Sequence, residues 1–161
     1  MAYNIVDLIE RIIDTSNKIL MLYQDNSKNK IDENFSNIII KVFIKHQNEK
    51  ISYYKSLQEK LKKEKINEIH CFTYDKIASL IGQFNNKVQF SPYKNMKELM
   101  ENILNIDKDV RALYIDIRGR LMENKQYCNT EYNVLSDIIH LEEKYLADLE
   151  RLYKESYEKH L

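Results

Sequence analysis

The stretch EKINEIHCFTYDKIASLIGQFNNKVQFSPYK, residues 64–94, separates two long parts of the sequence that both show helical periodicity. It is far longer than the loop between two antiparallel helices, which usually has about two to eight residues. Within it, TYDKIASLIGQF predicts a short amphipathic helix near residues 74–84, lying across one end of the molecule and punctuated by Gly82 and Pro92. We therefore expect one long crossover, residues 64–94, between the two parts of the chain.

Four longer segments flank this crossover in two pairs. Apolar residues recur every three or four positions through 3–24, 32–63, 95–123 and 130–157, which is typical of amphipathic helices. Asn95 and Glu98 have the spacing of a capping box at the start of the third segment. The connections within each pair are short and polar, as between antiparallel neighbours. The pattern predicts an all-α, ferritin-like four-helix bundle that forms a single domain over residues 1–161.

The composition excludes several other classes of protein. Two glycines and one proline among 161 residues are too few for the turns of a sheet-rich fold. The 25 basic and 25 acidic side chains balance, so there is no electrostatic reason to expect nucleic-acid binding. No segment is long and apolar enough to span a membrane, and Asp7, Glu10 and Arg11 interrupt the first apolar pattern, unlike a signal peptide. We expect a cytoplasmic protein that binds neither membrane nor nucleic acid.

The two cysteines carry no recognisable chemistry. Cys71 and Cys128 are far apart in the sequence and belong to no CxxC motif or Cys/His cluster. We therefore expect them to be ordinary reduced cysteines. A glycine-rich phosphate loop and a nucleophile with a base at workable spacing are also missing, so the sequence predicts no catalytic residue.

Each long helical segment carries one polar residue in the middle of its apolar stripe. Each of these residues has an apolar or aromatic residue seven positions before it and another seven positions after it. The four residues are Ser16, Lys50, Asp107 and Glu142. A polar group on a buried face is the informative exception to the usual burial pattern. We therefore expect these four side chains to meet at mid-height in the core.

The segments IDKDVRALY (106–114) and LEEKYLADL (141–149) resemble helices of the rubrerythrin-like branch of the ferritin-like superfamily. In that family two helices each supply a carboxylate and two others each supply Glu-x-x-His to a pair of metal ions. The resemblance implies that Asp107 and Glu142 match two of the six ligand positions. At the other four positions this chain differs, with Ser16 and Lys50 in place of glutamates and Tyr53 and Tyr145 in place of histidines.

These replacements predict a degenerate di-iron site without metal. A protonated amine repels dications and can itself neutralise carboxylates, so Lys50 could replace the metal charge. The predicted polar core joins Lys50 to Asp107 and Glu142, with hydroxyl groups completing it and Arg111 as a second cation. The hydroxyl groups are those of Ser16, Tyr53 and Tyr145. The first hypothesis is a binding or scaffolding protein without cofactor, and not an enzyme.

Two alternatives stay open from the sequence. The first is a metal-dependent oxidoreductase or peroxidase that holds iron or manganese in a rearranged site. Its candidate ligands are His46, Glu49, Asp107 and Glu142. The second is a structural bundle whose exposed apolar residues dock a protein partner or a second copy in a homodimer. The residues expected on that surface are Ile38, Ile40 and Val42.

Overall fold

The computed structural model describes residues 2–27, 35–123 and 129–158. These residues are almost entirely helical, which confirms the all-α prediction. The helices are α1 (Ile5–Asn26), α2 (Phe35–Lys62), α3 (Cys71–Lys87), α4 (Met96–Met122) and α5 (Asn129–Tyr157), and two short strands are β1 (Tyr3–Asn4) and β2 (Glu68–Ile69). The observed helix ends lie within three residues of the predicted ends. Residues 32–34 of the second predicted helix, and Cys128, lie outside the described residues.

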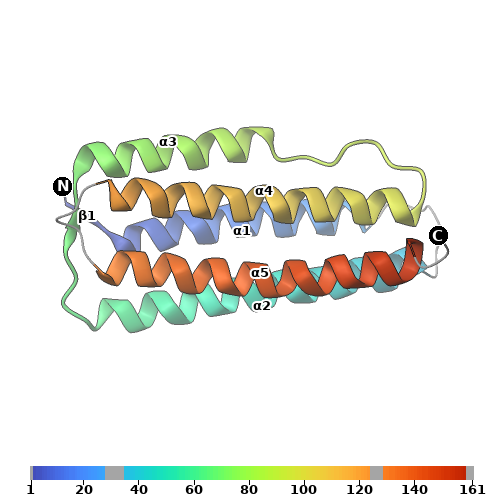
Figure 1. Cartoon of the computed structure of the whole chain (residues 1–161), viewed down its shortest axis with the longest axis horizontal. Helices are drawn as coiled ribbons and strands as arrows, with labels where there is room; N and C mark the ends of the chain where they lie inside the picture. The colour runs from blue at the N-terminus through green and yellow to red at the C-terminus, as the bar shows by residue number, and fades with distance from the viewer. Residues whose placement is uncertain (1, 28–34, 124–128, 159–161) are drawn as a thin grey trace.

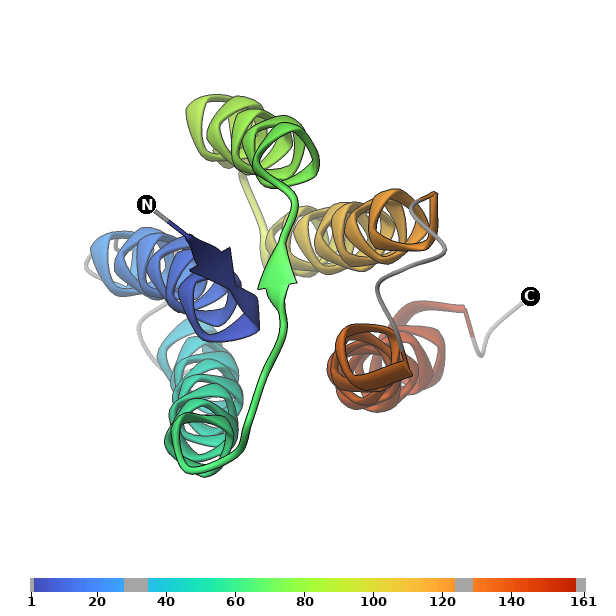
Figure 2. The same ribbon diagram turned by 90° about the vertical axis from the view of Figure 1, so that its left-hand side faces the viewer.

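The four longer helices run side by side along the long axis of the molecule (Figure 1). The closest packing is within sequence neighbours, since α1 packs against α2 and α4 packs against α5. The end-on view in Figure 2 shows α3 on the outside, next to α1 and α4, and both contacts are present in the structure. The two tightly packed pairs are thus joined through the α3 segment and through the core between them.

Helix α3 lies lengthwise against α1 and α4, not across one end of the molecule as predicted. Its buried residues are Tyr74, Ile77 and Ile81, which are spaced three and four residues apart. This spacing makes one apolar stripe along the helix, and the stripe is buried along its whole length only if α3 lies parallel to its neighbours. Gly82 continues the helix instead of ending it, whereas Pro92 lies in the irregular segment before α4.

The beginning of α1 is fixed by a capping box and by the two strands. The Asn4 side chain accepts a hydrogen bond from the Asp7 backbone N–H at 3.3 Å, and the Asp7 carboxylate accepts one from the Asn4 N–H at 2.9 Å. In the strand pair β1–β2, Tyr3 lies opposite Ile69. The Tyr3 ring also stacks on Tyr74 with a centroid distance of 4.0 Å. These contacts attach the start of α1 to the start of α3.

The beginning of α4 has half of the predicted capping box. The Asn95 side chain accepts a hydrogen bond from the Glu98 backbone N–H at 2.9 Å, as the spacing predicts. The Glu98 carboxylate, however, accepts from the backbone N–H of Lys94 at 2.6 Å instead of from that of Asn95. The helix therefore begins where the sequence indicates, with one of the two bonds shifted by one residue.

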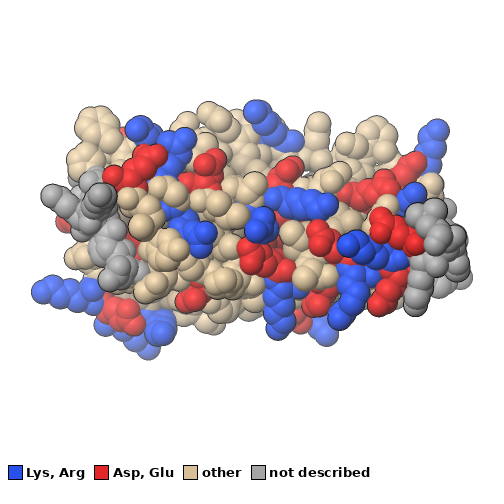
Figure 3. All heavy atoms as spheres, viewed as in Figure 1, with Lys and Arg blue, Asp and Glu red and all other residues tan. Residues whose placement is uncertain are grey.

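The surface carries mixed charge, and the face in Figure 3 shows blue and red side chains interspersed. Ile38 is 62% exposed and Val42 is 38% exposed, as expected. Ile40 is buried, contrary to expectation, because it lies on the same helical face as Phe43 and Lys50, which point into the core. Within the ranges that the structure describes, no helix combines the length and the apolar character needed to cross a membrane.

Candidate functional site: a buried ammonium between two carboxylates

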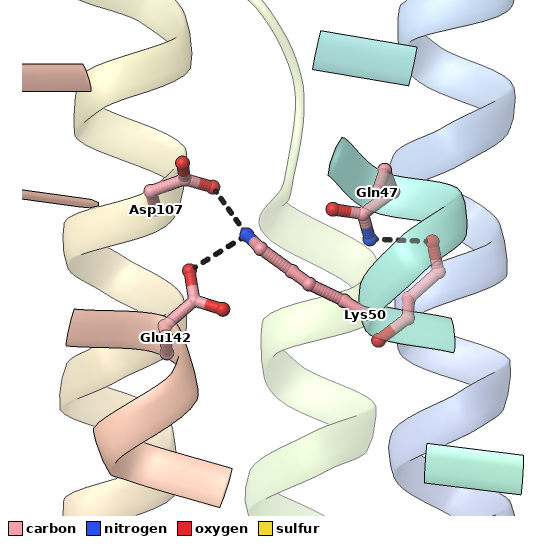
Figure 4. Close-up of polar contacts among 5 residues, drawn as sticks. Gln47, Lys50, Asp107 and Glu142 are labelled. Atoms are coloured by element: carbon pink, nitrogen blue, oxygen red, sulfur yellow. Dashed lines mark hydrogen bonds and ion pairs between the residues drawn. The ribbon is translucent and has the colours of Figure 1, made fainter. Parts of the chain in front are cut away.

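Lys50, Asp107 and Glu142 meet in the core. The Lys50 Nζ donates a hydrogen bond to Glu142 Oε1 at 3.1 Å and lies 3.6 Å from Asp107 Oδ1 (Figure 4). The three residues are only 4%, 6% and 1% exposed. We call these three residues the ion cluster. Because buried charges are stable only when they are paired, one ammonium held by two carboxylates is the expected way to bury them together.

Each residue of the ion cluster lies on the face of its helix that points into the core. Lys50 follows buried Phe43 by seven residues on α2, and Asp107 lies between buried Ile103 and Val110 on α4. Glu142 lies on the same face of α5 as its buried neighbours in the turns before and after it. Lys50 therefore reaches across the core from α2 to carboxylates on α4 and α5, as Figure 4 shows. Its flexible four-carbon side chain makes that reach possible.

Lys50 stays protonated in this position. Burial by itself would lower the pKa of Lys50, but the carboxylates of Asp107 and Glu142 outweigh burial and raise it. Burial raises the pKa of Glu142 to about 7; the Lys50 ammonium opposes this rise, and the neighbouring Asp107 adds to it. Burial also raises the pKa of Asp107, with Lys50 acting in the opposite direction. The cation is therefore permanent, and the carboxyl groups are the ones that can change protonation state.

Ser16 is buried on α1 and makes polar contacts through both its backbone and its hydroxyl. Gln47 Nε2 donates a hydrogen bond to the Ser16 carbonyl oxygen at 2.9 Å, and both residues are buried (Figure 4 shows the Gln47 amide). The Ser16 hydroxyl lies near the Tyr114 hydroxyl. Burial raises the pKa of Tyr114 to about 12, and the contact with Ser16 acts against this rise. Ser16 is thus buried as expected, and its contact with Gln47 joins α1 to α2.

Tyr145 touches the ion cluster with its ring and not with its hydroxyl. The Lys50 Nζ lies 5.3 Å from the centre of the Tyr145 ring, within the range of a cation–π contact. The Tyr145 hydroxyl donates to Glu49 Oε2 at 2.7 Å near the surface. A phenol is longer than an imidazole, so its hydroxyl passes beyond the ion cluster. The hydroxyl contact predicted for Tyr145 is therefore replaced by a contact with its ring.

Tyr53 and Arg111 lie outside the ion cluster, contrary to expectation. Tyr53 is half-buried and packs edge-to-face on Tyr54, with ring centroids 6.0 Å apart. The Arg111 Nε lies 3.0 Å from Glu143 Oε1, and these side chains are 42% and 38% exposed. An arginine at the edge of a buried face keeps its charged end in water by extending outward. Lys50 is thus the cation of the ion cluster, without the second cation that the sequence suggested.

The four candidate ligands of the metal hypothesis do not converge on one point in the described structure. The His46 ring packs on Tyr145, with centroids 5.0 Å apart, and on Phe43, while Glu49 is exposed and bound to Tyr145. Within the described part of the chain, no three His, Cys, Asp or Glu side chains converge where an ion could be held. Asp107 and Glu142 already hold the ammonium. The six positions do not fit the pair of metal ions that the resemblance implies, because two of the four carboxylates and both imidazoles are replaced by other side chains.

A small pocket adjoins the ion cluster. It has a volume of about 10 Å³ open to the centre of a water molecule, which is room for roughly one water. Residues of α1, α2, α4 and α5 line it. They are Tyr23, Phe43, His46, Gln47, Lys50, Asp107, Tyr145 and Leu149. The Tyr23 hydroxyl is buried and, in the described structure, has no hydrogen-bond partner of ordinary geometry.

Sequence reasoning did not single out Tyr23 and Gln47 as residues of the site. Tyr23 follows Ser16 by seven residues and so has the same helical phase, and Gln47 precedes Lys50 by one turn. A search for every polar atom on the inward stripes, and not only the central one, would have found both.

Comparison of the chain with protein families, with curated proteins and with solved structures gives no match. The class of protein established here is an all-α protein with a buried ion cluster.

Proposed function

We propose that this protein is a ferritin-like four-helix bundle, related to the rubrerythrin-like branch, in which an ammonium has replaced the di-metal centre. In this proposal it acts as a binding or scaffolding protein and not as an oxidoreductase. Two features of the fold support the topology: α1–α2 and α4–α5 are tightly packed pairs, and residues 63–95, which contain α3, connect them. One long connection between two antiparallel pairs is the arrangement of ferritin-like bundles.

The position of the Lys50 Nζ is the single observation that carries this proposal. It lies within 3.6 Å of oxygens from both Asp107 and Glu142, where it provides the positive charge that a metal would otherwise provide. A dication at the same carboxylates would face an ammonium at close range, with too few anionic oxygens to overcome the repulsion. The ion cluster therefore favours a core without metal and a role that depends on the surface of the bundle.

Metal analysis tests the proposal directly. The protein should be purified anaerobically and without an affinity tag from cells supplied with iron, manganese and zinc, and its metal content measured by elemental analysis. We expect far less than one ion per chain. One or two tightly held ions per chain would contradict the proposal and favour the iron or manganese oxidoreductase. A chelator-treated sample and a sample reloaded with each metal separate weak surface binding from a defined site.

A four-residue variant provides the matched positive control. It combines Ser16→Glu, Lys50→Glu, Tyr53→His and Tyr145→His. These substitutions restore the family's glutamates and histidines at the four positions where this chain differs. If the bundle is ferritin-like, this variant should take up metal that the parent does not. Circular dichroism of the variant must show that it is folded, because four changes near the core can unfold the protein. The hydrogen bonds that support metal ligands in the family can also be missing from this chain.

The surface role has its own test. Ile38 and Val42 are exposed and lie one turn apart, so they share one face of α2. Sedimentation velocity over a wide range of protein concentrations should show association if this face binds a second copy. The variant Ile38→Ser/Val42→Ser should lose it, while Lys41→Ser/Lys45→Ser, which changes exposed neighbours on the same helix, should keep it. A parent that stays monomeric throughout would exclude the homodimer.

A further inference from the structure

The charges in the ion cluster do not balance. One ammonium, Lys50, faces two carboxyl groups, Asp107 and Glu142, so the fully ionised cluster has one excess negative charge. All three residues are at most 6% exposed, so bulk water can screen that charge only weakly. An uncompensated charge in a protein interior is strongly unfavourable, and a buried group normally removes it by changing its protonation state.

Among the residues that the structure describes, the groups around the ion cluster do not supply a second permanent cation. From α1 the neighbours are Tyr23 and Ser16, from α2 they are His46 and Tyr54, from α4 Tyr114, and from α5 Tyr145. The phenols remain neutral, because burial raises the pKa of Tyr23, Tyr54, Tyr114 and Tyr145. His46, which faces the Asp107 side, is the other group there that can carry a positive charge.

We infer that the ion cluster is a binding site for a single exchangeable proton, which Glu142 takes up as the pH falls and releases as it rises. Uptake converts the Glu142 carboxylate and one proton from water into a neutral carboxylic acid, which leaves Lys50 paired with one carboxylate, Asp107. The site then has no net charge. This inference uses the metal-free core of the proposed function, but it does not depend on any partner.

Glu142 is the better proton acceptor of the two carboxyl groups. It is the more deeply buried residue, at 1% exposed against 6% for Asp107. Burial, together with the nearby Asp107, raises the pKa of Glu142 to about 7 despite the Lys50 ammonium. Burial raises the pKa of Asp107 too, but Lys50, His46 and the Tyr23 hydroxyl all act against that rise. We therefore assign the proton to Glu142 and the role of counterion of Lys50 to Asp107.

The small pocket adjoins the ion cluster at Lys50 and Asp107. Its lining also includes His46, which is only half-buried. A single water in this pocket would lie beside the Tyr23 hydroxyl, which also lies close enough to Asp107 to lower the pKa of that carboxyl group.

Carboxyl NMR on the wild-type protein tests the inference. The protein is labelled with ¹³C at the glutamate side-chain carboxyl carbon, its metal content is measured, and the pH is varied with a chelator present. We expect one carboxyl signal to titrate near pH 7, far above the exposed glutamates, and that signal to be missing from Glu142→Gln. The inference is overturned if every glutamate titrates in the ordinary acid range around pH 4 to 5.

The pH dependence of unfolding gives an independent readout. The pKa of Glu142 is raised from 4.5 in the unfolded chain to about 7 in the folded protein. The contribution of Glu142 to the free energy of unfolding is therefore fully present below pH 4.5 and is lost as the pH rises through 7. In that window the ratio of folded to unfolded protein should fall by up to about tenfold per pH unit. Glu142→Gln should show a flatter dependence, while Glu143→Gln, a change at the exposed neighbour, should keep the slope of the parent.

The outcomes separate this inference from the proposed function. If the stability of the parent, of Glu142→Gln and of the control Glu143→Gln depends on pH with the same slope, the inference of a proton site is wrong. If Glu142→Gln does not fold, the carboxyl titration of the wild-type protein decides alone. Metal found in the purified protein would instead contradict the proposed function, whereas a metal-free protein without a titration near neutral pH would contradict only the proton site.

Discussion

Two adjacent glutamates on α5 make ion pairs of nearly equal length in very different surroundings. Glu142 lies 3.1 Å from Lys50, with side chains 1% and 5% exposed, and Glu143 lies 3.0 Å from Arg111, with side chains 38% and 42% exposed. Distance alone would rank these contacts as equivalent. Their burial differs completely, however, and burial decides how much a change in either partner affects stability.

The physical difference is what remains when one partner is removed. At the surface, water and salt solvate the remaining charge, so an exposed pair contributes about 0–1 kcal/mol. In the core, the remaining charge has lost its hydration without gaining a partner, and breaking a buried pair typically costs about 3–5 kcal/mol. The buried pair need not be more stabilising than an apolar core, but it tolerates the loss of one member far less well.

The largest expected effect is that of Lys50→Met. At pH 7 it should lower the free energy of unfolding by about 3–5 kcal/mol, because Asp107 and Glu142 are left buried without their cation. At pH 5 the loss should be smaller, since the carboxyl groups can protonate in the folded state. Urea unfolding of parent and variant at both values of pH measures this. Equal losses at the two values would contradict the role of unpaired charge.

A triple variant separates charge from packing. Lys50→Met combined with Asp107→Leu and Glu142→Met removes every charge of the ion cluster and keeps similar side-chain volumes. It should regain most of the stability lost in Lys50→Met, since apolar replacement of a complete buried ion group is often neutral or stabilising. If the triple variant is as unstable as the single one, the loss comes from packing around the lysine side chain and the comparison of the two glutamates fails.

Gln47→Leu should have a smaller effect than Lys50→Met. The change removes a buried hydrogen bond of 2.9 Å to the Ser16 carbonyl but leaves no unpaired charge. We expect a loss of about 1–2 kcal/mol with little dependence on pH, which urea unfolding at pH 5 and pH 7 can check. A loss as large as that of Lys50→Met would show that neutral hydrogen bonds, and not charge, dominate this part of the core.

Tyr145→Phe should be milder still. The variant keeps the ring beside Lys50 and removes only the hydroxyl that donates to the exposed Glu49. We expect a loss of about 0.5–1 kcal/mol in urea unfolding. Tyr145→Leu, which also removes the ring, should lose more if the cation–π contact stabilises the ion cluster. Equal losses in the two variants would assign the whole effect to the hydroxyl.

The smallest effect is expected for Arg111→Ala. Its partner Glu143 is well exposed, so the loss should be about 0–1 kcal/mol and should shrink further at high salt. A double-mutant cycle with Glu143→Ala, measured at low and high ionic strength, gives the coupling energy. A coupling that approaches the Lys50→Met effect, or that salt does not change, would remove the distinction between the two ion pairs.

The sequence predicted the helical segments well because helical periodicity and caps are local signals. Asn95 caps α4 at the predicted position. The central polar residues Lys50, Asp107 and Glu142 also meet, as their place on the inward stripes indicated. The remaining details of the site depend on side-chain length and direction, which a stripe of about 100° per residue does not resolve. This is why Tyr53 and Arg111 share a helix with members of the ion cluster without joining it.

By itself, the sequence determined that this protein is all-helical and that four polar groups lie at the middle of its inward helical faces. Only the tertiary structure decided which of them touch, since contact depends on how the helices are rotated against one another. It also decided that α3 lies along α1 and α4, that Ile40 is buried while Ile38 is exposed, and that a water-sized pocket adjoins Asp107. Periodicity places a residue on a face, whereas packing places that face against a particular neighbour.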